Sequence, residues 1–415
     1  MQSLVVMMMI ERLSVCFLSL TTLGLAGLSA QTLIQASDAD GVVRLLPGDA
    51  SVLESREVRK DLPCTVTPVK PALAFDLRFR AGYEVGIPLK ELAGSEGLLT
   101  MVFRVTPDER KEDAVYLSQH LSVPAIEEDA KGSAYLNGVF ELGEGRYHVD
   151  FLMRDRGERV CSSYWEIEAR LAPKDKQLVL TLAPDSVAAV DQRAFREEPA
   201  AESAADGRPL NVKVLVNLAP QNSSSAMLQP FDTDALASTL RLIAREPKIR
   251  KFSVVAFNLQ QERVVFRQEN TDQIDFPALG EALKPGSLGT VNVNQLSQKN
   301  GEAQFLAELL GKEMNDSAYH PDAVIIAGLK STLDQSVPEN YLNQLNDVDY
   351  PVFYMNVSLD PQTNPWRDVI GRAVKRLKGY EYTISRPRDL WYAWTEIMSR
   401  MAKGRVEKSK SAALR

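Results

Sequence analysis

Apolar residues along the chain fall into short runs whose spacing differs between two parts. In residues 63–182 the runs alternate apolar with polar positions and are separated by turn signals, which predicts a β-sandwich. In residues 210–402 apolar runs alternate with segments of helical period, which predicts strands joined by helices in a mostly parallel sheet. The strands expected in the first part are residues 73–78, 98–105, 115–121, 134–142, 146–154, 165–171 and 177–182.

The second part is organised around residues 212–216, where valine and leucine surround one lysine. Such a run suits a strand that is buried on both faces. A polar loop, 217–225, follows it, and α/β folds place their sites where loops leave the carboxyl ends of strands. We expect further strands at 252–257, 263–267, 323–327, 352–357 and 380–384, with helices at 234–245, 276–283, 302–314, 366–377 and 387–401.

One string in the first part is more specific than its neighbours. Residues 143–155, GEGRYHVDFLMRD, place Tyr147 directly after a glycine turn and at the start of an alternating strand. This string resembles the late strands of immunoglobulin-like sandwiches, although the usual second cysteine just after the tyrosine is absent. The resemblance implies an all-β immunoglobulin-like sandwich.

The order of elements in residues 211–401 resembles that of a von Willebrand factor A (vWA) domain. A buried strand ends in a polar loop, an antiparallel edge hairpin follows, and the Gly289-Thr290 loop precedes the apolar strand AVIIA. The string GYEY before a helix that begins RPRDLW is similar to the last strand and helix of the family. The resemblance implies an α/β fold with a doubly wound, mostly parallel sheet of the vWA or Rossmann-like type, most similar to vWA-related secreted bacterial proteins.

The metal-ion-dependent adhesion site of that family is degenerate here. Where the family has Asp-x-Ser-x-Ser, this chain has Asn217, Ala219 and Gln221, and Gly328 lies near the position of a second acid. Only Thr290 matches. Because Mg²⁺ prefers charged oxygen ligands, we expect no metal ion and no cofactor, and we expect Asn217 to bond loop backbone amides instead. A register that uses residues 223–225 supplies hydroxyl groups but still no acid.

The ends and the joining segments have distinct compositions. Residues 1–30 carry an apolar run that ends in Ser29-Ala30, which predicts a signal peptide and a secreted or periplasmic protein; a retained N-terminal anchor is the alternative. Residues 31–62 form a polar lead-in. Residues 183–209 are rich in alanine, acidic residues and proline, so we interpret them as a linker or a fluctuating helix. Residues 403–415 are a basic tail.

The cysteine count depends on that processing. Cys16 leaves with the signal peptide, so the mature chain keeps Cys64 and Cys161. An even pair in an exported protein predicts one disulfide, and two buried free thiols are the alternative.

Other catalytic chemistry is weakly represented in the sequence. His120, His148 and His320 lie far apart and lack metal-site spacing, and neither a nucleophile elbow nor a phosphate-binding loop occurs. The net charge of −7 argues against nucleic-acid binding. The basic residues of 372–378 are either a solvated face or a contact for an acidic partner.

We therefore predict an exported, non-enzymatic interaction or adhesion-type protein with a metal-independent vWA-like domain. The partner is a protein of unknown identity, with envelope polysaccharide as a further possibility, and the oligomeric state is open. A cell-envelope hydrolase or a carbohydrate-binding envelope protein is the alternative. The residues expected in the binding loops are Asn217, Gln221, Asn222, Ser223, Ser224, Thr290, Gly328 and Lys330.

Overall fold

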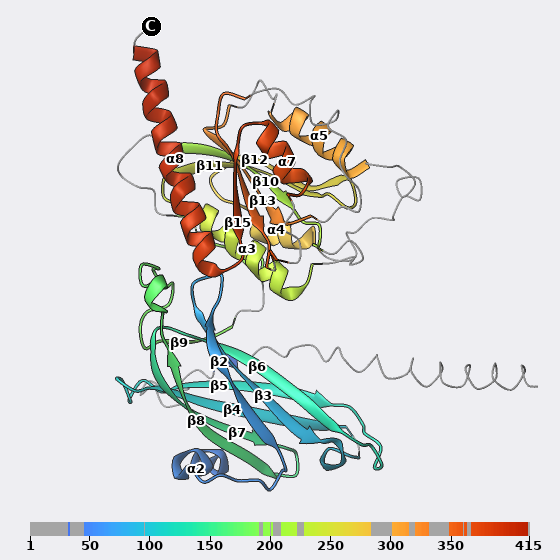
Figure 1. The fold of residues 1–415 in the computed structure, drawn as a ribbon. Coiled ribbons are helices and arrows are strands. Elements are labelled where there is room, and N and C mark those ends of the chain that lie inside the picture. Colours follow the sequence, from blue (N-terminus) through green and yellow to red (C-terminus); the bar gives the residue numbers. More distant parts are fainter. Residues whose placement is uncertain are drawn as a thin grey trace, which may run out of the picture. The chain divides into compact units, whose positions relative to one another are not determined.

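The computed structural model divides into two compact units, which are described separately (Figure 1). Unit 1 comprises Met1–Ala72, Arg80–Arg170 and Ala183–Val190, and unit 2 comprises Leu73–Phe79, Leu171–Leu182 and Asp191–Arg415. Side chains are described except at 32–33, 230 and 404–413. The structure describes residues 32–33, 45–94, 96–190, 194–199, 201, 209–221, 228–283, 301–314, 320–331, 348–359, 361–362 and 367–413.

Unit 1 is built from two sheets of strands, one with five strands and one with four. Their facing side chains form an aromatic core, in which the ring of Tyr83 lies 4.5 Å from that of Phe103 and the ring of Phe151 lies 5.0 Å from Phe103. The first sheet has the order β1-β5-β4-β7-β8, with β1 Thr32–Leu33, β5 Val115–Val123, β4 Gly97–Pro107, β7 Gly145–Arg154 and β8 Val160–Ala169. The second has the order β2-β3-β6-β9, with β2 Thr65–Leu73, β3 Phe79–Pro88, β6 Ser133–Leu142 and β9 Val187–Ala189.

A disulfide and a short helix close one side of unit 1. Cys64 and Cys161 are bonded across 97 residues, with their Cα atoms 6.2 Å apart, so the predicted disulfide is confirmed. Helix α2 (Pro47–Ser55) lies within the predicted lead-in, and its Val52 and Leu53 pack on the outer face of the first sheet. The segment after it is held to β8 by a hydrogen bond from the Leu62 amide to the Val160 carbonyl.

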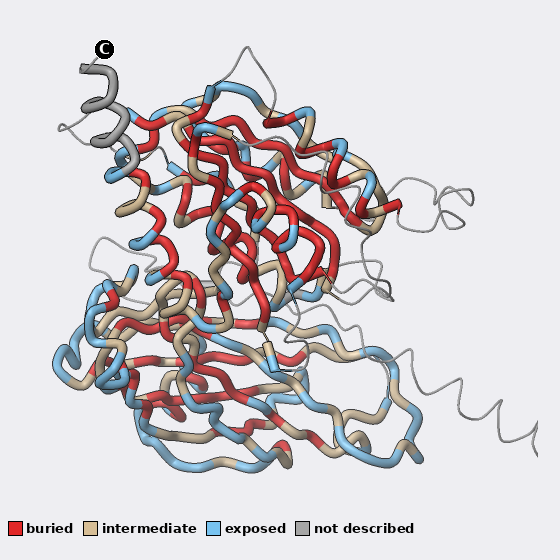
Figure 2. Tube along the Cα trace, turned by 45° about the horizontal axis from the view of Figure 1, so that its top comes forward, coloured by how far each residue is buried: buried red, intermediate tan, exposed pale blue. Residues whose placement is uncertain are grey.

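Unit 2 contains one six-stranded sheet with the order β12-β11-β10-β13-β14-β15. All neighbours are parallel except β12, which pairs antiparallel with β11. The central strands are the most deeply buried part of the unit, because apolar side chains occupy both of their faces (Figure 2). The bounds are β10 Leu210–Asn217, β11 Ile249–Asn258, β12 Arg263–Thr271, β13 Ala323–Leu329, β14 Val352–Val357 and β15 Tyr380–Ile384.

Helices cover both faces of this sheet. On one face lie α3 (Pro230–Ala244), α4 (Phe276–Glu281) and α8 (Pro387–Ala413). On the other face lie α5 (Gly301–Met314) and α7 (Val369–Arg376).

The single lysine of the first buried strand has a partner that its local sequence does not reveal. Lys213 Nζ lies 3.2 Å from a carboxylate oxygen of Glu313 on α5, and both side chains are almost fully buried. Arg267 on β12 adds a second contact to Glu313 at 2.6 Å. A buried cation is stable only when it is paired, so α5 and β10 depend on each other through this ion pair.

Two strand predictions in the first part are wrong. Residues 73–78 are a turn between β2 and β3, closed by a hydrogen bond from the Ala74 amide to the Arg78 carbonyl, with Leu77 at a φ of 60°. The apolar alternation there has another cause, since Phe75 belongs to the core of unit 2. Residues 177–182 contain no strand, and the Thr181 amide donates to Leu77 O instead.

The predicted fold class is also wrong. We expected an α/β chain of the vWA or Rossmann-like type behind an immunoglobulin-like sandwich. Of the described residues, 40% are in strands and 25% in helices, and they form antiparallel sheets and one mixed sheet. The pattern of apolar residues underestimated the strand content because β2 and β9 have only exposed or half-buried positions, which mask their period.

The joining segments contain more regular structure than their composition indicates. The predicted linker, 183–209, includes β9, which pairs with β6, and Glu198, which forms an ion pair with Arg245 at 2.7 Å. Helix α8 continues to Ala413 and so includes most of the predicted basic tail. The predicted signal peptide lies outside the described residues. Among the described residues, no helix is long and apolar enough to span a membrane.

Candidate functional site

The carboxyl ends of β10, β13 and β14 bring polar residues into one row. Asn217 is paired in register with Gly328, and Gly328 with Asn356. Because side chains two residues apart share a face, Asn217 follows Leu215 and Asn356 follows Tyr354 onto the face covered by α5 and α7. The two amide side chains of Asn217 and Asn356 therefore lie on the same face of the sheet, on either side of Gly328.

Asn217 holds the beginnings of two loops. Its Oδ1 atom accepts hydrogen bonds from the backbone amides of Ala219 and Leu259, each at 3.2 Å. This confirms that Asn217 bonds loop backbone amides. Its Nδ2 atom is buried and has no hydrogen-bond partner among the described residues.

Gly328 lets β10 and β13 approach closely at this row. A Cβ atom at position 328 would lie 2.7 Å from the Asn217 Cβ, closer than real Cβ contacts. Any other residue would therefore displace Asn217 from the amides that it binds.

Asp368 has a similar role on the next loops. It lies directly before α7, where its Oδ1 accepts a hydrogen bond from the Gly371 amide at 2.7 Å and caps the helix. Its Oδ2 accepts from the Tyr354 hydroxyl at 2.8 Å and from the Ser331 amide at 3.0 Å. Burial raises the pKa of Asp368, and these three donated hydrogen bonds oppose the rise. One carboxylate thus joins the loop after β13, strand β14 and α7.

A second carboxylate is engaged in the same neighbourhood. Glu381 on β15 accepts hydrogen bonds from Asn356 Nδ2 at 2.9 Å and from Arg367 Nε at 2.6 Å. The Asn356 Oδ1 and the Ser358 Oγ are buried and have no partner among the described residues. Unsatisfied buried polar atoms are rare, so they mark a place where water or a ligand group can bind.

The other predicted residues divide into two groups. Gln221 is half-buried, and Lys330 is buried with its amide donating to the Val357 carbonyl. Asn222, Ser223, Ser224 and Thr290 lie outside the described residues.

Sequence reasoning missed Asp368, Tyr354 and Glu381. Their roles depend on contacts between strands and loops far apart in the chain, although an aspartate at the start of a helix is a recognisable cap signal. Within the part of the chain that the structure describes, no cluster of three His, Cys, Asp or Glu residues is suited to a metal ion.

Comparisons with known proteins do not assign the chain to a family. No family model and no curated protein matches it. A β-glucuronidase from Bacteroides uniformis is 11% identical, with a TM-score of 0.18 over 77% of this chain and 39% of that one. A glycosyl hydrolase family 2 member from Bacteroides cellulosilyticus is 10% identical, with a TM-score of 0.19 over 78% of this chain and 39% of that one. The alkylpurine DNA glycosylase AlkC from Pseudomonas fluorescens is 14% identical, with a TM-score of 0.18 over 29% and 34% of the two chains.

Proposed function

We propose that the chain is an exported, non-enzymatic binding protein that recognises a protein partner through the loops at the carboxyl ends of β10, β11 and β13. The main support for this proposal is that the buried polar groups at this edge of the sheet bind the backbone of the loops. Asn217 and Asp368 each bind backbone amides at the beginnings of loops or helices. Such bonds give loops a rigid support, and loops on rigid supports are frequent binding surfaces.

The same bonds argue against a catalytic or metal-binding role for these groups. The carboxylates of Asp368 and Glu381 already accept hydrogen bonds on both oxygens. A general base or a metal ligand needs an oxygen that faces the substrate or the ion. The proposed binding to a protein partner is therefore independent of a metal ion.

Export is supported by the disulfide, since such bonds persist in oxidising compartments. With the apolar N-terminal run, this supports a secreted or periplasmic location.

Calorimetry of the full chain with Mg²⁺, Mn²⁺ and Ca²⁺ tests the metal-independent part of the proposal. We expect no saturable heat, because the strand-end positions supply amides and a glycine where an ion needs acids. Thr290→Ala is the control, since Thr290 is the one matching ligand position. A stoichiometric site of micromolar affinity that Thr290→Ala abolishes would show that the adhesion-type metal mechanism operates. A parallel screen against glycans and envelope extracts addresses the hydrolase alternative, which reproducible turnover would favour.

A further inference from the structure

Unit 1 contains a pocket that the sequence does not indicate. It has a volume of about 420 Å³ and opens on the first sheet, at β4, β5 and β7 and the loop before β5. Along β4, Phe103 contacts Tyr83 of the other sheet, so the alternate residues Arg104 and Thr106 lie on the opposite face. The pocket is lined by Arg56, Arg104, Thr106, Lys111, Ala114, Tyr116 and His148.

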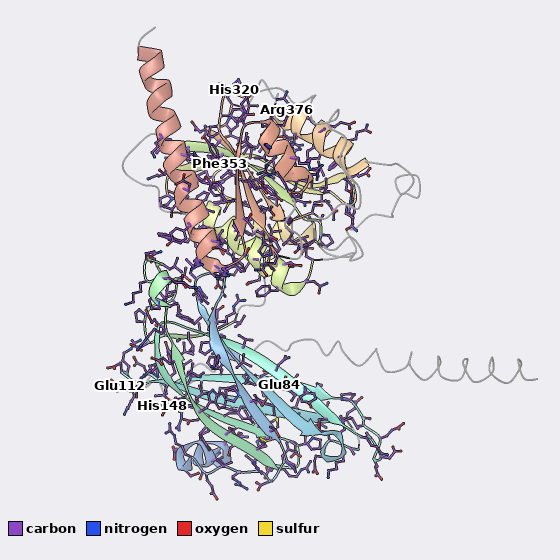
Figure 3. All side chains as sticks on the ribbon, viewed as in Figure 1. Glu84, Glu112, His148, His320, Phe353 and Arg376 are labelled. Atoms are coloured by element: carbon purple, nitrogen blue, oxygen red, sulfur yellow. A yellow bond between two sulfur atoms is a disulfide. The ribbon has the colours of Figure 1, made fainter. Side chains whose placement is uncertain are left out.

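The lining is cationic although the chain as a whole carries a net charge of −7. It contains two arginines and a lysine and no acidic residue. Figure 3 labels His148 on β7 in this region, and Glu112 in the loop before β5. His148 also lines the pocket, and Asp108 and Glu166 lie 3.2 and 3.6 Å from its ring nitrogens.

One buried carboxylate is shared between the two arginines. Asp150 Oδ2 lies 2.7 Å from Arg104 Nε, and its Oδ1 lies 3.2 Å from Arg56 Nε. Lys111 is exposed and has no partner among the described residues. Arg56, Arg104 and Lys111 therefore make their side of the lining positive, with Asp150 as the carboxylate bonded to the two arginines.

The cations are held in place before any ligand arrives. Arg104 Nη2 donates to the Leu53 carbonyl at 2.7 Å, in addition to its contact with Asp150. Arg56 occupies the C-cap of α2 in the left-handed conformation, with a φ of 52°. Asp150 contacts the Nε atom of Arg56. The terminal nitrogens of Arg56 and the ammonium group of Lys111 therefore remain as donors to a ligand.

We propose that this pocket binds a small molecule carrying two negative oxyanion charges, such as a phosphate monoester or a dicarboxylate. Three cationic side chains at one pocket favour a ligand with anionic oxygens, and guanidinium and ammonium groups are the preferred donors to such oxygens. The hydroxyl groups of Thr106 and Tyr116 add neutral polar contacts. The volume falls within the range of small-molecule sites. This site is in unit 1 and is independent of the proposed strand-end site.

Calorimetric titration of the full chain with inorganic phosphate and, separately, with succinate tests the proposal at low ionic strength. We expect saturable binding of at least one probe, and the probe that binds distinguishes a tetrahedral ligand from a dicarboxylate. Lys111→Gln and Arg56→Gln are each expected to weaken binding about tenfold, the loss for one charged hydrogen bond. Lys131→Gln, an exposed lysine of unit 1 outside the pocket, is the matched control and should leave affinity unchanged.

The outcomes separate clearly. Absence of saturable binding of both probes up to millimolar concentration would overturn the proposal, as would equal losses in Lys131→Gln and the pocket variants. Circular dichroism checks the fold of each variant. If Arg56→Gln fails to fold, Lys111→Gln decides, because Lys111 has no structural contact to lose among the described residues. Arg104 is left unchanged, since its removal would leave Asp150 with only the half-exposed Arg56.

Discussion

Replacing Cys64 and Cys161 by serine is expected to lower the free energy of unfolding of unit 1 by about 4–5 kcal/mol. The bridge closes a loop of 97 residues that contains β2 to β7 and the start of β8. In the chain-entropy model, a cross-link of this span restricts the unfolded chain and stabilises the fold by that amount. Urea denaturation measures the difference, and hydrogen exchange at β7 and β8 assigns the transition to unit 1.

Wild-type protein under reducing conditions is the control for this variant. It should unfold close to the urea concentration of the double serine variant, because both lack the bond and differ only in carrying thiols or hydroxyl groups at these positions. If oxidised wild type and the variant share one midpoint, the disulfide does not stabilise unit 1.

Replacing Glu313 by glutamine is expected to destabilise unit 2 by about 3–5 kcal/mol, the cost of removing one partner of a buried ion pair. The buried Lys213 would then lose the carboxylate that lies 3.2 Å from its Nζ, and Arg267 would lose the same carboxylate. Adding Lys213→Met should recover much of the loss, because the buried positive charge is then removed as well. Glu308→Gln, at an exposed position of the same helix, is the control and should change stability by less than about 0.5 kcal/mol.

The same ion pair predicts a pH dependence. Burial alone would raise the pKa of Glu313, but Arg267 and Lys213 outweigh it and lower the pKa below the ordinary value of 4.5. A carboxylate with a lowered pKa stabilises the fold above its unfolded pKa, and this contribution is lost as the pH falls through the folded pKa. The stability difference between wild type and Glu313→Gln should therefore be full at pH 7 and shrink below about pH 4.5. A difference that stays constant down to pH 3 would contradict the role of the charge.

The apolar pattern predicted the best-buried elements well. The strand at Val352–Val357 has the predicted bounds because its continuous burial gives a mostly apolar run. The strand at Tyr380–Ile384 also has the predicted bounds, although only Ile384 is fully buried. Phe75 misled the prediction because it is buried against a core that its neighbours in sequence do not share. Strand β9 was missed because it is three half-buried residues long and exists through its pairing with β6.

Only those contacts of the candidate site that join residues close together in the sequence could be predicted. Asn217 ends a buried strand and reaches the amide two residues ahead, a local contact that its residue type favours. The role of Asp368 depends on Ser331 and Tyr354, which lie 37 and 14 residues away. The cationic pocket combines Arg56, Arg104 and His148 from one helix end and two strands, and nothing in the local sequence links them.

Site-specific photo-crosslinking tests the central claim, that loops held by Asn217 bind a protein partner without a metal ion. A photoreactive residue replaces Gln221 in the loop after β10 or, as the matched control, the exposed Glu308 on α5. The full chain is then irradiated with envelope extract, with and without chelator. We predict a discrete protein adduct from position 221 that is absent from position 308, unchanged by chelator, and reduced when Asn217→Ala releases the two loop amides. An adduct that disappears with chelator, or that forms equally from both positions, would contradict the account.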